Sequence, residues 1–219
     1  MKKQTTFWTI IVLVLALAAP ALVGASDLQD IKLPAPRMTG GMPLMQALAA
    51  RSTSRDFSDK DLPLQVLSNL LWAADGINRP DSGKRTAPSA NNVQNIDVYA
   101  ALKSGLYLYD AKDNVLKAVL AEDVRSATGS QEFVKTVPLD VIYVADYSKF
   151  KRGTEETKAF YSAAHVGFIA QNVYLFCASE GLAVVVRGMV DKEALAKVMK
   201  LGADQKVMLS QSVGYPKTS

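Results

Sequence analysis

Cysteine and histidine are almost absent from this 219-residue sequence, which contains one of each. Because Cys177 stands alone, neither an intrachain disulfide nor a Cys-x-x-Cys redox pair can form. His165 is the only imidazole, which likewise excludes the usual clustered zinc sites. Stability must therefore come from a buried core, and about 190 residues at this apolar content suffice for one domain.

An excess of charge of one sign is also missing. The chain has 25 basic and 21 acidic residues, a net charge of +4. Its first 25 residues contain two lysines and no acid, so the remainder has 23 basic and 21 acidic residues and a net charge of +2. There is no long basic stripe and no interleaving of aromatic with basic residues. These absences exclude nucleic acid as an expected partner.

Long apolar runs are confined to the N-terminus. Two lysines precede an apolar run from Phe7 to Ala19, which is followed by a proline and a stretch of small residues. The run is shorter than the about 20 residues of a membrane span. We therefore interpret residues 1–25 as a secretory signal peptide cleaved after Ala25, and an uncleaved anchor reaching Val23 is the alternative. The mature protein is expected to be periplasmic or secreted, with no stable membrane span.

The rest of the chain reads as a leader and one domain. Residues 26–42 hold prolines and glycines with little periodicity, which predicts an extended leader before a domain over 43–219. Helices are predicted over 43–51, 63–76, 154–180 and 191–201. Strands are predicted over 98–102, 106–109, 115–119, 137–145, 182–186 and 207–213. Since the two kinds of element mix without regular alternation, the fold class is α+β with three layers.

The third predicted helix is the longest element. Thr154 suits its N-cap, acidic residues fill its first turn, and Gly181 ends it. From Thr154 to Glu180 it would be roughly 40 Å long, a central element of the domain. Mostly small residues recur along it at helical spacing, namely Ala163, Gly167, Ala170 and Tyr174. This stripe fits either a dimer contact or ordinary packing within the chain.

An anion site is predicted directly after the first helix. The segment Arg51–Phe57 contains two guanidinium groups and three hydroxyls within five residues. Arginine presents a planar fork of donors that matches phosphate oxygens, and serine and threonine add short donors to the same group. A solvated turn rich in arginine and serine is the alternative for this segment taken alone.

A second binding segment is predicted between the second helix and the first strand. Residues 78–94 form a long connection with few apolar side chains, which is typical of a binding loop. Within it Pro88 restricts the backbone, and the small Ser89 and Ala90 let a flat ligand approach the main chain. Asn92 offers a donor and an acceptor at amide spacing, which suits the polar edge of a nucleobase or a flavin. An asparagine-rich turn is the alternative.

Together these segments resemble the FMN-dependent nitroreductase family. The first fits Arg-x-[Ser/Thr]-x-[Arg/Lys]-x-Phe and the second fits Pro-Ser-[Ser/Ala]-x-Asn-x-Gln, in the family's order. A third match runs from Gly181 and Leu182 to Gly188, Met189 and Asp191. Residues 85–90 and 105–110 resemble in particular the SagB-type dehydrogenase branch. The resemblance covers 43–216.

The resemblance implies a nitroreductase-like three-layer fold, whose central mixed, mostly antiparallel sheet has helices on both faces and a long central helix. It also implies an exported FMN-dependent oxidoreductase that transfers hydride or electrons to or from a small organic substrate. The flavin would carry the chemistry, so no catalytic side chain and no metal are implied. One alternative is a non-catalytic flavin-binding or interaction protein on the same fold. Another is a domain that binds no flavin, with Arg51 and Arg55 paired to acids.

The resemblance also implies a set of cofactor-binding residues at a homodimer interface. They are Arg51, Ser52, Thr53, Arg55, Pro88, Ser89, Ala90, Asn92, Gly188 and Met189. The first four would hold the FMN phosphate, and the Pro-Ser-Ala run would line the ring or the ribityl chain from the partner subunit. The asparagine would bind the pyrimidine side, and the main chain of the last two would face the flavin N5.

Several further residues carry separate expectations. Asn95 and Ile96 stand where many family members have Pro-Trp. We expect Arg187 to be a surface charge, with contact to the flavin as the alternative. We expect His165 to be a hydrogen-bonded core or interface residue rather than a proton donor, and Cys177 to be a small buried hydrophobe. The loops over 120–136 and 146–155 are expected to select the substrate.

Overall fold

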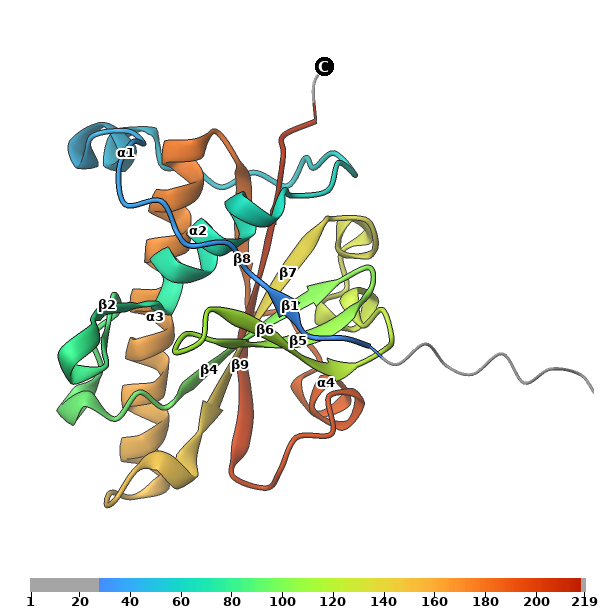
Figure 1. The fold of residues 1–219 in the computed structure, drawn as a ribbon. Coiled ribbons are helices and arrows are strands. Elements are labelled where there is room, and N and C mark those ends of the chain that lie inside the picture. The colour runs from blue at the N-terminus through green and yellow to red at the C-terminus, as the bar shows by residue number, and fades with distance from the viewer. Residues whose placement is uncertain (1–27, 218–219) are drawn as a thin grey trace, which may run out of the picture.

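The computed structural model describes residues 28–217, and the predicted signal peptide lies outside them. Its main sheet contains β1 (Ile31–Lys32), β4 (Ile96–Leu102), β5 (Gly105–Asp110), β6 (Val115–Leu120), β7 (Leu139–Asp146), β8 (Ala183–Arg187) and β9 (Gln205–Gly214). The strands lie in the order β1-β6-β5-β4-β7-β9-β8 (Figure 1). Every neighbouring pair is antiparallel.

Four α-helices accompany the sheet: α1 (Leu44–Ala50), α2 (Leu64–Asp75), α3 (Glu155–Glu180) and α4 (Lys192–Val198). Short 3₁₀ turns, η1 to η5, cover Pro80–Ser82, Ala90–Asn92, Arg125–Thr128, Glu132–Lys135 and Tyr147–Lys149. A small hairpin of β2 (Ile77–Arg79) and β3 (Lys84–Arg85) lies apart from the main sheet. None of the helices within 28–217 is long and apolar enough to cross a membrane.

Alternate residues of the central strands enter two separate cores, because successive side chains of a strand point to opposite faces. Val141 and Tyr143 of β7 pack with α2 and α3 on one face. Ile142 and Val144 pack on the other face with Leu195 of α4. The sheet is therefore covered on both sides. The predicted α+β, three-layer fold with a mostly antiparallel sheet and a long central helix is confirmed.

The bounds of α3 follow from its capping residues, as predicted. The Thr154 hydroxyl accepts the N–H of Thr157, and Gly181 closes the helix in the left-handed conformation with φ +66°. At about 1.5 Å per residue the helix is roughly 39 Å long. It packs against the sheet through buried side chains that include Cys177, whose pKa is raised by burial. Cys177 is therefore the inert, buried residue that was expected.

The stripe of small residues on α3 divides between two environments. Ala170 and Tyr174 are buried within the chain, whereas Ala163 and Gly167 are exposed. Large apolar side chains are exposed on the same helix, with Phe160 at 69% and Phe168 at 45%. The C-terminal half of the stripe thus serves packing within the chain, and its N-terminal half lies on an uncovered apolar surface.

Candidate functional site

The predicted anion segment lies along the edge strand β8 and the C-terminal end of α3. The Ser54 N–H donates to the carbonyl of Val184 at 3.0 Å. Farther along, Phe57 pairs with Pro216, and Ser58 donates its N–H to the carbonyl of Tyr215. The segment is thus fixed on one side by the edge of the sheet and on the other by the C-terminal chain.

Tyr174 is a residue of this region that sequence reasoning did not assign to the site. Its hydroxyl accepts the N–H of Val186 at 3.0 Å, so its own proton is available for the Thr53 hydroxyl at 3.1 Å. The Arg51 guanidinium lies over its ring at 5.5 Å from the centroid, within the range of a cation–π contact. Its place in the helical stripe was the only signal that could have indicated it.

The two guanidinium groups of the segment form no ion pair with an acidic residue of 28–217. Arg51 is half-buried and Arg55 is exposed, and neither forms an ion pair with another residue of 28–217. The alternative in which both arginines pair with acids is therefore not the arrangement observed. Five donors of each guanidinium remain available to an anion, apart from the face that Arg51 turns to the tyrosine ring.

The second predicted segment forms a loop held in an unusual backbone conformation. Asn91, Asn92 and Gln94 have φ values of +52°, +53° and +47°. Asparagine tolerates this left-handed region, whereas glutamine rarely adopts it. Within the loop, the Gln94 N–H donates to the Ser89 hydroxyl at 3.0 Å. Backbone strain of this kind clusters at ligand-binding sites and persists only when the surroundings enforce it.

Gln94 connects the loop to the β2–β3 hairpin and to Asn92. Its side-chain oxygen accepts the Nε–H of Arg85 at 3.0 Å. Its side-chain nitrogen donates to the carbonyl of Gly83 and to the Asn92 Oδ1, both at 3.0 Å. One hydrogen bond thus holds the Asn92 oxygen, and the Asn92 Nδ2 has no hydrogen-bond partner within 28–217 and is free to donate to a ligand.

His165 anchors the same loop from α3. Its Nε2 accepts the N–H of Ala90 at 2.8 Å, and its Nδ1 lies 2.7 Å from the Asn95 Oδ1. The Asn95 amide nitrogen donates in turn to the Ser162 hydroxyl at 2.8 Å. Because Nε2 is an acceptor, the proton of the neutral ring is on Nδ1. Burial lowers the pKa of His165, which is the buried, hydrogen-bonded histidine that was expected.

A buried carboxyl group lies beneath the loop. Asp75 and Arg85 border a void of about 10 Å³ together with Pro88, Ser89 and His165. The Arg85 guanidinium lies 3.4 Å from the Asp75 carboxylate. Burial raises the pKa of Asp75 to about 7, although the positive charge of Arg85 opposes the shift. A polar layer thus lies beneath the loop, and it includes two groups that can titrate, Asp75 and His165.

The expectation for Arg187, at the end of β8, is wrong. This side chain is 5% exposed, and it donates to the Asp140 carboxylate of β7 at 2.7 Å and to the Thr128 carbonyl at 2.6 Å. Asp140 also accepts from the hydroxyls of Thr128 and Ser212. The guanidinium therefore points inward because β7 offers it the Asp140 carboxylate and η3 offers it the carbonyl and hydroxyl of Thr128, which the valine run before it does not reveal.

Gly129 makes this arrangement possible by its lack of a side chain. A Cβ at this position would overlap the terminal guanidinium nitrogen of Arg187. Arg187 therefore joins the loop over 120–136 to the strand that ends beside Gly188 and Met189. Both of these residues are exposed, and their backbone N–H groups donate to no acceptor within 28–217.

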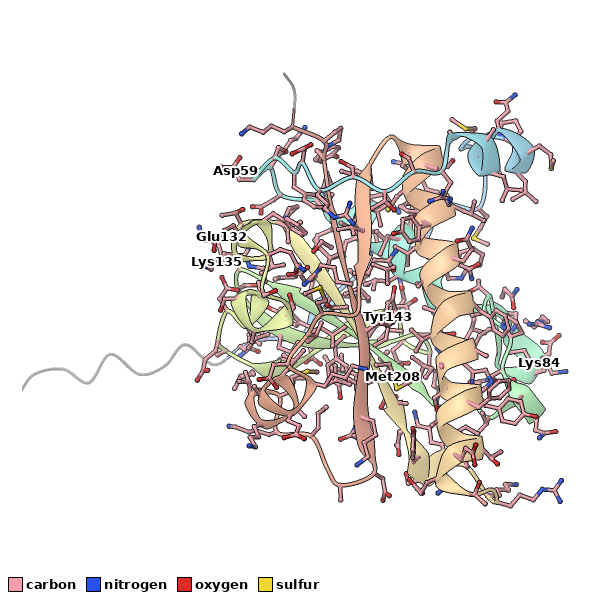
Figure 2. The ribbon with its side chains drawn as sticks, turned by 180° about the vertical axis from the view of Figure 1, so that it is seen from behind. Asp59, Lys84, Glu132, Lys135, Tyr143 and Met208 are labelled. Atoms are coloured by element: carbon pink, nitrogen blue, oxygen red, sulfur yellow. The ribbon has the colours of Figure 1, made fainter. Side chains whose placement is uncertain are left out.

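Within one chain the predicted site residues form two groups rather than one. The Arg51 segment contacts Tyr174 and the Pro88 loop contacts His165, nine residues earlier on α3. Nine residues correspond to about two and a half turns and 13 Å, so the two contacts lie on opposite sides of the helix. Figure 2 shows Asp59 and Lys84, which flank the two segments, on opposite sides of α3.

A cavity of about 870 Å³ opens beside the Pro88 loop at the N-terminal end of α3. Its polar and aromatic lining includes Asn91, Asn92, Lys149, Lys151, Arg152 and Tyr161. Lys149 is paired with Asp97 at 2.6 Å. No acidic residue lines the cavity within the described part of the chain, so the charged side chains of its lining are all basic.

The chain thus combines an α+β, three-layer fold with two groups of unpaired donors along its central helix. Comparison with known proteins shows which family has this fold. The profile of the Nitroreductase family matches residues 48–215, more than half of the chain. A crystal structure of a candidate nitroreductase from Ralstonia eutropha is 44% identical, with a TM-score of 0.84, and the match covers 89% of this chain and 92% of that one. The chain therefore belongs to the nitroreductase family.

Two further relatives agree with this assignment. A candidate nitroreductase from Methanocaldococcus jannaschii is 28% identical over 185 residues, which cover 80% of this chain and 87% of the relative. The microcin synthetase McbBCD complex of Escherichia coli is 17% identical with a TM-score of 0.66, covering 94% of this chain and 85% of that one. This last similarity concerns the fold alone.

Proposed function

We propose that the protein is an FMN-dependent oxidoreductase that transfers hydride or electrons to or from a small organic substrate. It belongs to a family whose members are typically FMN-dependent oxidoreductases. The observation that carries the proposal is the set of donors without partners. These donors are the guanidinium groups of Arg51 and Arg55, the Nδ2 of Asn92, and the N–H groups of Gly188 and Met189.

Each group of donors in this set suits a different part of FMN. The guanidinium groups suit the phosphate, with the hydroxyls of Ser52 and Thr53 beside them. The Asn92 amide suits a carbonyl of the pyrimidine ring, and the free N–H groups after β8 suit N5. Bound FMN would supply the hydride or electron transfer, and the protein would bind it, orient it and exclude water.

We propose that the site is completed in a homodimer. The two donor groups lie on opposite sides of α3, which supports their union across an interface rather than within one chain. Exposed apolar side chains offer a surface for the partner. They are Phe160 and Phe168 of α3 and Met45 of α1, which is 75% exposed. Pro88, Ser89 and Ala90 would then reach the flavin that the partner holds by its phosphate.

We also propose that the protein acts outside the cytoplasmic membrane after removal of residues 1–25. NAD(P)H is a cytoplasmic reductant, so an exported enzyme needs another electron donor, or it works as a dehydrogenase. In the second case the reduced flavin would pass electrons to a quinone, to oxygen or to a redox partner. The N-terminal lysines and apolar run are the observation that supports export.

The visible spectrum of the purified mature protein tests the function. We expect a yellow protein whose absorbance shows FMN. After anaerobic photoreduction, the reduced flavin should be reoxidised on mixing with nitroaromatics, quinones or oxygen. A yellow protein that none of these acceptors reoxidises would indicate a carrier rather than an oxidoreductase. A colourless protein that takes up no added FMN would contradict both.

The basic side chains that line the cavity beside the Pro88 loop predict a preference for anionic acceptors. The photoreduced enzyme should be reoxidised by 4-nitrobenzoate faster than by the neutral 4-nitrobenzamide. Each exposed charge contributes on the order of 1 kcal/mol at contact in water, so the variant Lys151→Gln/Arg152→Gln should reduce the ratio of the two rate constants by roughly tenfold. Salt at 1 M should reduce it similarly, since the screening length falls to about 3 Å. Lys197→Gln/Lys200→Gln, beside α4, is the control, and equal ratios in both variants would contradict the prediction.

A further inference from the structure

The Pro88–Gln94 loop is held both by bonds within it and by contacts from other elements. Three of its seven residues are in the left-handed region without being glycine, and the free-energy cost of this conformation must be offset by the surroundings. Inside the loop, the Asn92 N–H donates to the Ser89 carbonyl, the Val93 N–H donates to the Ala90 carbonyl, and the Gln94 N–H donates to the Ser89 hydroxyl. The remaining support must come from outside the loop.

Contacts at both ends supply that support. At one end Gln94 accepts from Arg85 and donates to the Gly83 carbonyl, and its amide also holds the Asn92 oxygen. At the other end the Ala90 N–H, in the 3₁₀ turn itself, donates to His165. Ala90 and His165 are 75 residues apart in the chain, so this contact fixes the loop to the central helix.

The His165 ring can accept the Ala90 proton in only one arrangement. The Ala90 N–H can only donate, so the ring must face it with an acceptor. The Asn95 oxygen, whose amide nitrogen donates to Ser162, then accepts from the His165 Nδ1. Nδ1 therefore carries the proton and Nε2 presents its lone pair. His165 is 2% exposed and Asn95 is fully buried, so water does not replace either partner.

From this geometry we propose that His165 and Asn95 are positioning residues, which hold the backbone of Ala90 and thereby the loop that receives the flavin. The inference rests on the proposed function, since the loop matters only if it binds FMN. In this pair the Asn95 oxygen accepts from the protonated Nδ1 and so stabilises the tautomer in which Nε2 accepts, while the histidine holds the loop.

The same arrangement makes the loop sensitive to protonation of the ring. An imidazolium would turn an Nε2–H toward the Ala90 N–H, two donors facing each other. The neighbours that also carry or gain charge are Asp75 of α2 and Arg85 of β3, across the small void. Tyr161 of α3 stacks on the ring at 6.1 Å between centroids. Asp75 is the one among them that can titrate near neutral pH, so it must be separated from His165 in the test.

Three variants of the full chain test the proposal through their affinity for FMN, followed by quenching of flavin fluorescence. His165→Phe removes the acceptor and should weaken FMN binding by about tenfold to a hundredfold. His165→Gln keeps a side-chain oxygen and should restore the affinity to within about threefold. Ala90→Pro removes the donor, and its backbone suits proline because Ser89 before it is extended. Combined with His165→Phe, Ala90→Pro should cause little additional loss of affinity, because the two substitutions remove the same hydrogen bond.

The pH profile provides a readout that a purely structural role would not change. Wild-type affinity should be constant from pH 8 to pH 6.5 and fall below that, whereas the fall in His165→Gln should be smaller and caused only by the FMN phosphate, whose pKa is about 6. Asp75→Asn should keep the wild-type profile. Because His165 is the only histidine, its ring nitrogens give unambiguous NMR signals, which should show the Nδ1–H tautomer at pH 7.

The outcomes separate the two proposals. If wild-type protein binds FMN and His165→Phe binds it equally well, the positioning role is wrong while the function stands. The same holds if the difference between the wild-type and His165→Gln profiles is absent. If wild-type protein binds no FMN, the function fails and the inference fails with it, whichever tautomer the ring shows.

Discussion

Replacement of Asp140 by alanine should lower the free energy of unfolding by about 3–5 kcal/mol, because it leaves the Arg187 charge buried without its anion. Asp140 is fully buried and Arg187 is 5% exposed. Burial raises the pKa of the Asp140 carboxyl against the opposing effects of Arg187, Ser212 and Thr128. The pair therefore contributes little net stability while both partners are present, and its cost appears when one is removed. Urea unfolding followed by circular dichroism measures the change.

Two controls separate charge from shape in this experiment. The double variant Asp140→Leu/Arg187→Met should recover much of the loss, because apolar residues of similar size often replace a buried pair without penalty. Glu132→Ala removes an acid that is 89% exposed in its pair with Lys135, and it should change stability by less than about 0.5 kcal/mol. An Asp140→Ala variant as stable as Glu132→Ala would show that the buried pair does not exist in solution.

The double variant Arg51→Ala/Arg55→Ala should weaken FMN binding by about 3 kcal/mol or more, roughly a hundredfold. The reason is that each hydrogen bond to a charged group contributes about 1.5–3 kcal/mol. Neither arginine pairs with an acid within 28–217. Their removal should therefore leave the fold unchanged. Equilibrium titration of the colourless apoprotein with FMN measures the effect.

Riboflavin, which lacks the phosphate, is the matched control for this prediction. Its affinity should be nearly the same for the wild type and the double variant, whereas that of FMN should fall. Lys112→Ala, in the turn between β5 and β6, is a control for loss of surface charge. Unchanged FMN affinity would refute the phosphate assignment. Equal losses for FMN and riboflavin would indicate damage to the loop or the dimer instead.

Elements with local signals were predicted from the sequence with close bounds. Thr154 and Gly181 cap α3 at the predicted ends, because capping depends on residues within one turn of the helix end. β7 was predicted as central from its apolar run, and all but its last residue are buried. β1 and the β2–β3 hairpin were missed. These strands have two or three residues, and they exist through pairing with segments that a local pattern does not contain.

The same distinction separates the site residues. The motifs around Arg51 and Pro88 were visible because their side-chain types and spacing are local, and their roles toward FMN stay predictions. The Arg187 expectation was wrong because its partners lie far away in the sequence, Asp140 47 residues earlier in β7 and Thr128 59 residues earlier in η3. The link from His165 to Ala90 was invisible for the same reason. Likewise, only the fold reveals that Tyr174 joins Thr53 to β8.

The sequence by itself determined the four helices, the longer strands, the fold class and the family, because these follow from periodicity, caps and motifs within short stretches of chain. Only the tertiary structure decided which polar groups are satisfied and which remain free for a ligand. Hydrogen bonds and ion pairs between distant segments depend on how strands and helices meet. The buried Asp140–Arg187 pair, the tautomer of His165 and the separation of the two donor groups across α3 all follow from that packing.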